Sequence, residues 1–216
     1  MLIPIFFVST ASAATDVLFV GNSYTFYNNL ERVVAEVFES AGETASTRRL
    51  TSGGLRLENH VSRALDETSE WHTHLVVETD DREWVVLQDQ SQIPGFPATS
   101  PDWVSSRDAA IVLDDLIESA GAQTIFFLTW GYFEGDRGNE WRFPDFATMQ
   151  ERLKEGYLAY AEACGSTERP VWIAPVGPAF GEIRRQVLES GEDPLAEGSL
   201  FRALYTGDGS HPSALG

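Results

Sequence analysis

Short apolar runs alternate along this chain with longer segments in which apolar residues recur every three or four positions. The first run, residues 16–20, is rich in β-branched and aromatic side chains and ends at Gly21. Such a run indicates a buried strand, whereas recurrence at three or four positions indicates an amphipathic helix. The helical recurrence stops at Gly42 and comprises Leu30, Val33, Val34, Val37, Phe38 and Ala41. This part of the chain therefore predicts a strand, a tight turn and a helix.

The same alternation continues beyond Gly42. Further strands are predicted at residues 43–50, 83–87, 124–129 and 170–175, and further helices at about 56–65, 109–117, 146–164 and 179–188. Strands that alternate with helices in this way are typical of a parallel sheet covered on both faces. Residues 94–103 contain three prolines and predict a loop at the carboxyl edge of the sheet. No repeat, low-complexity tract or linker interrupts the pattern, so we expect a single domain over residues 14–216.

Composition and charge indicate a packed domain and exclude some kinds of binding partner and site. Hydrophobic residues make up 43% of the chain and aromatic residues 12%, which favours a packed globular domain. The net charge of −18, from 33 acidic and 15 basic residues, disfavours nucleic acid and anionic membranes as partners. Cys164 is the only cysteine, which excludes an intrachain disulfide and a cysteine metal site. We expect its thiol to be buried in a helix.

The N-terminus resembles a secretory signal. Residues 2–14 are mostly apolar, and Ala11-Ser12-Ala13 has the small residues of a cleavage site, which predicts a signal peptide at residues 1–13. The apolar run is too short to span a membrane. We therefore expect an exported protein, periplasmic or extracellular, without stable membrane insertion.

A serine and a histidine stand at opposite ends of the chain in turns that suit catalysis. Ser23 directly follows the first predicted strand, where it would lie beside a helix N-terminus whose N–H groups favour developing negative charge. Asp208 and His211 lie three residues apart in a turn rich in glycine, serine and proline. These three residue types supply the nucleophile, the base and the orienting acid of acyl transfer.

These segments resemble the conserved blocks of the SGNH (GDSL-like) hydrolase superfamily. The matching residues are Gly21-Asn22-Ser23, Gly53-Gly54 and Asp208-x-x-His211-Pro212, in the same order and spacing over nearly the whole chain. Asn22 replaces the aspartate of the more familiar serine block. The resemblance implies a flavodoxin-like α/β/α fold of three layers, with five parallel strands in the order 2-1-3-4-5. It also implies a further helix after the catalytic histidine, so we expect these 216 residues to stop short of that helix.

The resemblance further implies ester hydrolysis through an acyl-enzyme, with Ser23 as nucleophile, His211 as base and Asp208 as its partner, and without a cofactor. The oxyanion would be bound by the backbone N–H groups of Ser23 and Gly54. The superfamily usually adds an asparagine from a Gly-x-Asn-Asp block, which this sequence lacks. The third predicted strand instead ends in Gln88-Asp89-Gln90, and a glutamine amide can donate at similar reach. The sequence therefore resembles a glutamine-bearing branch of the superfamily, and it leaves Gln88 and Gln90 as alternative donors.

Other histidines compete for the role of base. His60 falls on a predicted helix, and His72 and His74 precede the third strand. His72 and His74 have strand spacing but no clear third ligand, so we predict no metal site. The aromatic residues at 130–133 either line a pocket for an acyl or sugar group or pack in the core.

The sequence favours an exported esterase that removes acyl groups from carbohydrate or hydrolyses small esters. The alternative is an exported carbohydrate-binding module without catalytic activity, because a fold does not fix a function. A flavodoxin-like nucleotide binder is disfavoured, since the chain has neither a glycine-rich phosphate loop nor clustered cations. The expected partner is a small-molecule or carbohydrate ester.

Overall fold

A five-stranded parallel sheet forms the centre of the structure. The computed structural model describes residues 14–216, and the predicted signal peptide lies outside this range. The strands are β1 (Thr15–Gly21), β2 (Ala45–Thr51), β3 (Arg82–Leu87), β4 (Gln123–Phe127) and β5 (Trp172–Ala174). All neighbouring pairs are parallel, and their order is β2-β1-β3-β4-β5. The predicted strand order and the three-layer fold are confirmed.

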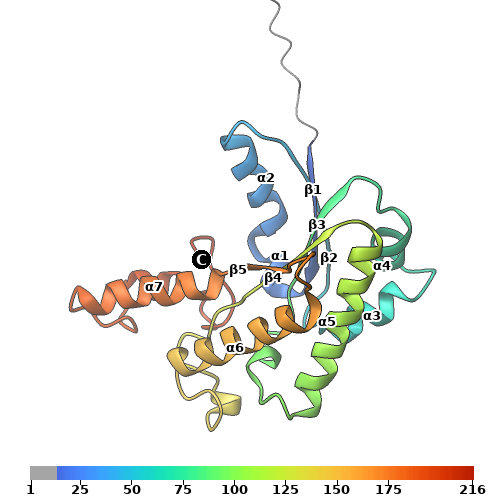
Figure 1. The fold of residues 1–216 in the computed structure, drawn as a ribbon. Coiled ribbons are helices and arrows are strands. Elements are labelled where there is room, and N and C mark those ends of the chain that lie inside the picture. Colours follow the sequence, from blue (N-terminus) through green and yellow to red (C-terminus); the bar gives the residue numbers. More distant parts are fainter. Residues whose placement is uncertain (1–13) are drawn as a thin grey trace, which may run out of the picture.

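Helices cover both faces of this sheet. The longer ones are α2 (Leu30–Ser40), α3 (Leu57–Ala64), α5 (Pro101–Ser119), α6 (Phe146–Cys164) and α7 (Val176–Glu189). The shorter ones are α1 (Ser23–Phe26), α4 (Glu70–His72) and α8 (Leu200–Ala203), with single turns at η1 (Tyr27–Asn29), η2 (Thr73–Val77), η3 (Ile93–Gly95) and η4 (Arg137–Asn139). Figure 1 shows α2 and α7 on one side of the sheet and α3, α5 and α6 on the other.

The apolar run of β1 serves both layers. Leu18 and Val20 pack with residues of α3, α5 and α6, whereas Val17 and Phe19 pack with residues of α7 and α8. A central parallel strand needs apolar residues on both of its faces, which explains the continuous run in the sequence. The carboxyl end of β1 is thereby fixed in the middle of the sheet.

The segment predicted as a loop at residues 94–103 contains the beginning of a helix. α5 begins at Pro101, eight residues earlier than the apolar spacing predicts. Proline suits the first position of a helix because its missing N–H would have no partner there. The Ser100 hydroxyl accepts a hydrogen bond from the Trp103 N–H and caps the helix. Residues 94–100 remain irregular apart from η3.

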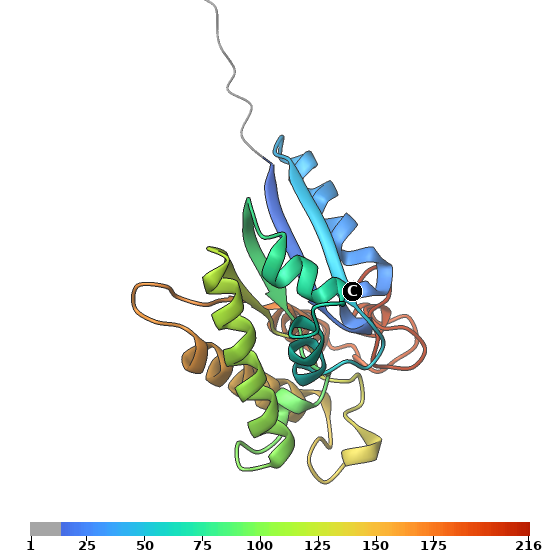
Figure 2. The ribbon, with the colours of Figure 1, turned by 90° about the vertical axis from the view of Figure 1, so that its right-hand side faces the viewer.

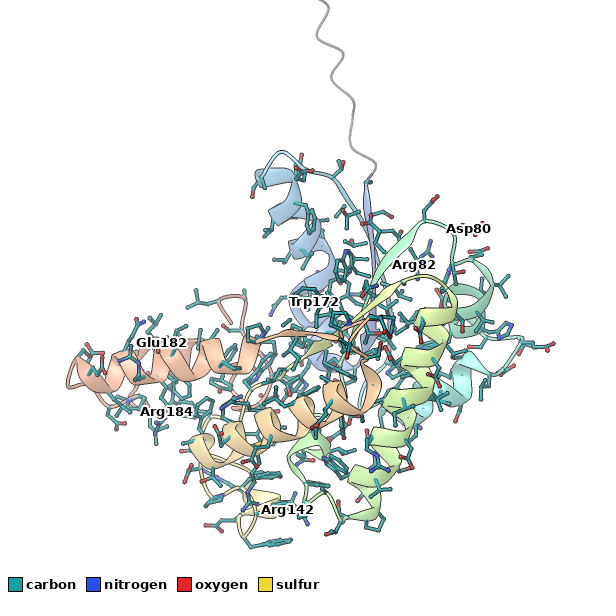
Figure 3. The ribbon with its side chains drawn as sticks, viewed as in Figure 1. Asp80, Arg82, Arg142, Trp172, Glu182 and Arg184 are labelled. Atoms are coloured by element: carbon teal, nitrogen blue, oxygen red, sulfur yellow. The ribbon has the colours of Figure 1, made fainter. Side chains whose placement is uncertain are left out.

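One face of the sheet is less completely covered than the other. α2 buries none of its residues fully. An apolar cavity of about 530 Å³ lies between α2 and the sheet, lined by side chains such as Phe19, Val34 and Phe127. Trp172 on the edge strand β5 is 53% exposed (Figure 3). No helix in the described residues is long and apolar enough to cross a membrane.

Candidate active site

Ser23 follows the carboxyl end of β1 and is the first residue of α1. Asn22 caps this helix, because its side-chain Oδ1 accepts a hydrogen bond from the Tyr24 N–H at 3.1 Å. Gly21 is required immediately before it, since a Cβ there would lie 2.4 Å from the Thr25 hydroxyl oxygen. The strand therefore ends abruptly and presents Ser23 at the edge of the sheet.

The structure brings the two ends of the sequence together at this serine. His211 Nε2 lies 2.8 Å from Ser23 Oγ, and His211 Nδ1 lies 2.6 Å from Asp208 Oδ2. Figure 2 shows the red C-terminal segment beside the blue segment of α1 and α2. The predicted nucleophile, base and acid are thus within hydrogen-bond distance of one another in the required order.

Asp208 is held by further hydrogen bonds. Its Oδ1 accepts from the backbone N–H groups of Ser210 and His211, each at 2.9 Å, and from the Thr206 hydroxyl at 2.8 Å. Partial burial alone would raise the pKa of Asp208. The backbone and side-chain donors outweigh that effect and hold its pKa well below the ordinary value. The carboxylate is therefore ionised wherever His211 can act as a base.

Aromatic rings surround the imidazole of His211. The ring of Tyr27 stacks on it at a centroid distance of 4.4 Å, and the ring of Tyr24 approaches edge-on at 5.3 Å. Tyr24 in turn stacks on Trp130 at 4.8 Å, and the Trp130 indole N–H donates to the Ser210 carbonyl at 2.9 Å. Trp130 is almost completely buried, so it packs in the core and holds the His211 loop through its bond to Ser210.

The backbone donors predicted for the oxyanion are both unoccupied. Within residues 14–216, the N–H groups of Ser23 and Gly54 have no hydrogen-bond partner. Gly54 has φ +69°, a left-handed conformation that favours glycine. The Asn22 amide donates to the Leu55 carbonyl at 2.9 Å and so ties the Gly54 loop to the serine turn. An aspartate at position 22 would lack this donor, which gives a physical reason for the asparagine.

The structure corrects one of the two glutamine alternatives. Gln88 is completely buried. Its Oε1 accepts hydrogen bonds from the Asn22 N–H and the Thr25 hydroxyl, each at 2.9 Å, and its Nε2 donates to the Asp89 carbonyl. Gln88 therefore supports the serine turn and does not face a substrate. Gln90 is partly exposed, with its Nε2 3.1 Å from Gln92 Oε1, and remains the candidate donor.

Asp89 has a role that sequence reasoning missed. This fully buried carboxylate accepts hydrogen bonds from the N–H of Leu57 at 3.2 Å, the N–H of Gln90 at 2.7 Å and the hydroxyl of Ser106 at 2.5 Å. It therefore joins the loop that carries Gly54 to the loop that carries Gln90. Burial raises the pKa of Asp89 to about 6 despite these donors. Its position at a strand end beside two glutamines was the only signal in the sequence.

Asp89 should make the stability of the fold depend on pH. Its pKa is higher in the folded state than the ordinary 3.8, so the folded state binds the extra proton and loses stability as pH rises from about 4 to about 6. In urea unfolding between about pH 4 and pH 7, the free energy of unfolding of the wild type relative to Asp89→Asn should fall by about 2 kcal/mol. Asp108→Asn, at an exposed aspartate on α5, controls for the substitution itself. A difference that stays constant with pH would contradict this assignment.

The competing histidines are used elsewhere. His60 is fully buried, its Nδ1 accepts from the Trp71 indole N–H at 2.8 Å, and burial lowers its pKa to about 3. His72 Nδ1 lies 2.8 Å from the Ala64 carbonyl, and His74 Nε2 lies 3.1 Å from an Arg48 nitrogen. None of them contacts Ser23. In the described part of the chain, no three potential ligand side chains gather as a metal site.

Comparisons with known proteins agree on one fold. No family model matches the sequence, and no curated protein matches it. Among solved structures, a protein from Slackia heliotrinireducens assigned to the SGNH hydrolases is 24% identical, with a TM-score of 0.68 over 94% of this chain and 92% of that one. An acetylxylan esterase from Geobacillus stearothermophilus is 13% identical, with a TM-score of 0.59 over 95% and 90%. A second acetyl xylan esterase is 13% identical, with a TM-score of 0.58 over 93% and 92%. The chain therefore has the fold of the SGNH hydrolases.

Proposed function

We propose that this protein is a serine hydrolase that cleaves carboxylic esters through an acyl-enzyme. The observation that carries the proposal is the 2.8 Å contact between Ser23 Oγ and His211 Nε2, with Asp208 on the other imidazole nitrogen. Residues far apart in the sequence adopt this arrangement at the carboxyl edge of the sheet, where α/β folds usually place their sites. The fold shared with two acetyl xylan esterases supports the same reaction.

The reaction begins when Ser23 Oγ attacks the ester carbonyl carbon while His211 Nε2 accepts the serine proton. Asp208 accepts the Nδ1–H hydrogen bond and stabilises the resulting imidazolium. Collapse of the tetrahedral intermediate breaks the ester C–O bond, and His211 returns the proton to the departing alcohol. Water then repeats the sequence on the acyl-enzyme, which releases the acid and frees Ser23.

The negative oxygen of each intermediate would be bound by the N–H groups of Ser23 and Gly54, and by the side-chain amide of Gln90. One such donor is typically worth about 3 kcal/mol in the barrier. Asn22 and Asp89 hold the segments that carry these donors at fixed positions.

The substrate we propose is a small acyl group on a carbohydrate or another hydroxyl-bearing alcohol. A cleft of about 360 Å³ lies beside Asp208 and Ser210. Charged and aromatic residues line it, among them Glu134, Arg137, Arg202, Tyr132 and Phe133. Such a lining suits hydroxyl groups better than a lipid chain. One protein of the same fold is an acetyl-xylooligosaccharide esterase, which supports this substrate class. We also propose export of the protein, on the basis of the signal-like residues 1–13.

A panel of p-nitrophenyl esters tests both reaction and acyl size. We expect kcat/KM to fall from acetate through butyrate to octanoate, and acetate to be released from acetylated xylooligosaccharides. The Ser23→Ala variant provides the background rate. A preference for octanoate would contradict the small acyl group. Binding of oligosaccharide without turnover of any ester would favour the noncatalytic binding module.

A further inference from the structure

Two consecutive residues after the nucleophile helix have an unusual backbone conformation. Asn28 has φ 56° and ψ 15°, and Asn29 has φ 54° and ψ 59°. Residues other than glycine rarely adopt this left-handed region, and asparagine is among the few that tolerate it. Strain of this kind persists where the surrounding structure requires it, often at functional sites.

The Asn28 side chain contacts the segment that carries the proposed base. Its Nδ2 donates to the Ser213 carbonyl at 2.8 Å and to the Pro212 carbonyl at 3.2 Å. These are the second and first carbonyls after His211. The neighbouring Tyr27 stacks its ring on the His211 imidazole, with 21° between the two planes. Asn28 therefore contacts the backbone of the histidine segment, and Tyr27 contacts the histidine ring.

Few other hydrogen bonds join the two segments. Between residues 22–29 and residues 206–216, the structure has the Ser23–His211 contact, the Tyr24–Ser210 hydroxyl pair at 2.5 Å and the two bonds of Asn28. The other hydrogen bonds from the backbone of residues 206–216 to the rest of the described chain lead to Leu204, to Phe133 and to the indole N–H of Trp130. Among the described residues, Asn28 therefore supplies the only hydrogen bonds from residues 22–29 to the backbone that follows His211.

We propose that Asn28 is a positioning residue that fixes the His211 segment relative to Ser23. This inference rests on the proposed serine hydrolase function. The left-handed backbone of Asn28 directs its side-chain amide toward the carbonyls of Pro212 and Ser213. The strained conformation therefore occurs at the residue that makes these two hydrogen bonds. Without the Asn28 amide, His211 keeps its hydrogen bond to Asp208. The segment after His211 then has no hydrogen bond to the residues around Ser23, so the distance from Nε2 to Ser23 Oγ is less well fixed. Small displacements of a base from its substrate are costly in rate.

The test replaces Asn28 by glycine and compares it with a matched variant. Glycine adopts φ near +56° without strain, and this relief partly offsets the loss of the two hydrogen bonds, so Asn28→Gly should stay folded and unfold within several degrees of the wild-type temperature. Its kcat for p-nitrophenyl acetate should fall roughly tenfold or more with little change in KM. Asn29→Gly removes the same kind of strain, and the Asn29 Oδ1 it deletes accepts only from Arg49 at 3.3 Å. This variant should keep the wild-type kcat.

A second measurement does not depend on catalysis. The imidazole NMR signals of His211, assigned with His211→Ala, should shift or broaden in Asn28→Gly and stay unchanged in Asn29→Gly. Asn28→Asp, which keeps the left-handed preference but not the donor, should behave like Asn28→Gly. Unchanged kcat and unchanged His211 signals in a folded Asn28→Gly or Asn28→Asp variant would overturn the proposal, as would equal losses in both glycine variants. If the wild type hydrolyses no ester, the proposed function fails, and the NMR comparison still decides the role of Asn28.

Discussion

Ser23→Ala and His211→Ala should each lower kcat for ester hydrolysis by about 10⁴–10⁶-fold, with little change in the melting temperature. Removal of either group leaves no activated nucleophile, because the serine hydroxyl is weak without its base and the base has nothing to deprotonate without the serine. The double variant should be no worse than either single variant. This lack of additivity distinguishes residues that act as a unit from residues that contribute separately.

Covalent labelling checks the same site without a substrate. A fluorophosphonate should modify Ser23 alone, as read by mass spectrometry of the digested protein, and His211→Ala should slow the labelling. Ser62→Ala and His72→Ala serve as matched controls, because Ser62 bonds the Glu58 carbonyl and His72 the Ala64 carbonyl, away from Ser23. Labelling of a different serine, or normal turnover by Ser23→Ala, would remove the proposed active site.

Asn22→Asp should lower kcat by about 10²–10³-fold, although it restores the aspartate of the more familiar serine block. An ionised aspartate keeps the cap on the Tyr24 N–H but cannot donate to the Leu55 carbonyl. Two oxygens would then face each other, and the Gly54 loop would move away from Ser23. The expected decrease in kcat is comparable to the decrease caused by removing one oxyanion donor.

The pH dependence of this variant provides a specific signature. Burial should raise the pKa of the new carboxyl group, and its protonated form can donate to Leu55 again. The ratio of wild-type to variant kcat should therefore decrease from about pH 8 to about pH 5. Asn59→Asp is the matched control, because Asn59 Oδ1 only accepts a hydrogen bond, from the Arg56 N–H at 3.0 Å, and aspartate can do the same. A ratio that does not vary with pH would point to a general disturbance of the fold.

The strand order and the meeting of Ser23, His211 and Asp208 were accessible from the sequence for different reasons. Continuous apolar runs identify buried parallel strands, and the family resemblance supplies their order. The turns that carry the three residues are short and contain glycine. Ser23 directly follows a predicted strand and could be placed at the carboxyl edge of the sheet. Asp208 and His211 follow the helix α8 and no strand, so only the family resemblance joined them to the serine. Within such turns the local sequence restricts the position of a side chain strongly.

The parts that the sequence did not reveal depend on side-chain direction and tertiary contacts. Gln88 and Gln90 both follow β3, and only the three-dimensional packing shows that Gln88 points inward to Asn22. The burial of Asp89 beside Ser106 joins elements 17 residues apart, which no local pattern encodes. The left-handed Asn28 likewise donates to carbonyls 184 and 185 residues away, and asparagine is compatible with many other turns.

The contact between Ser23 and His211 also has a consequence for synthesis of the chain. The two residues are separated by 188 positions, so a ribosome needs about 10–40 s after adding the serine before the histidine exists. The central strand β1 and its neighbours β2 and β3 can pair during this interval. The nascent chain still lacks His211, the proposed base, and should therefore not hydrolyse esters. A time course of ester turnover in a translating extract should therefore lag behind the appearance of protease-resistant fragments that contain β1. Hydrolysis would then report the completion of a molecule, and not merely the folding of its N-terminal part.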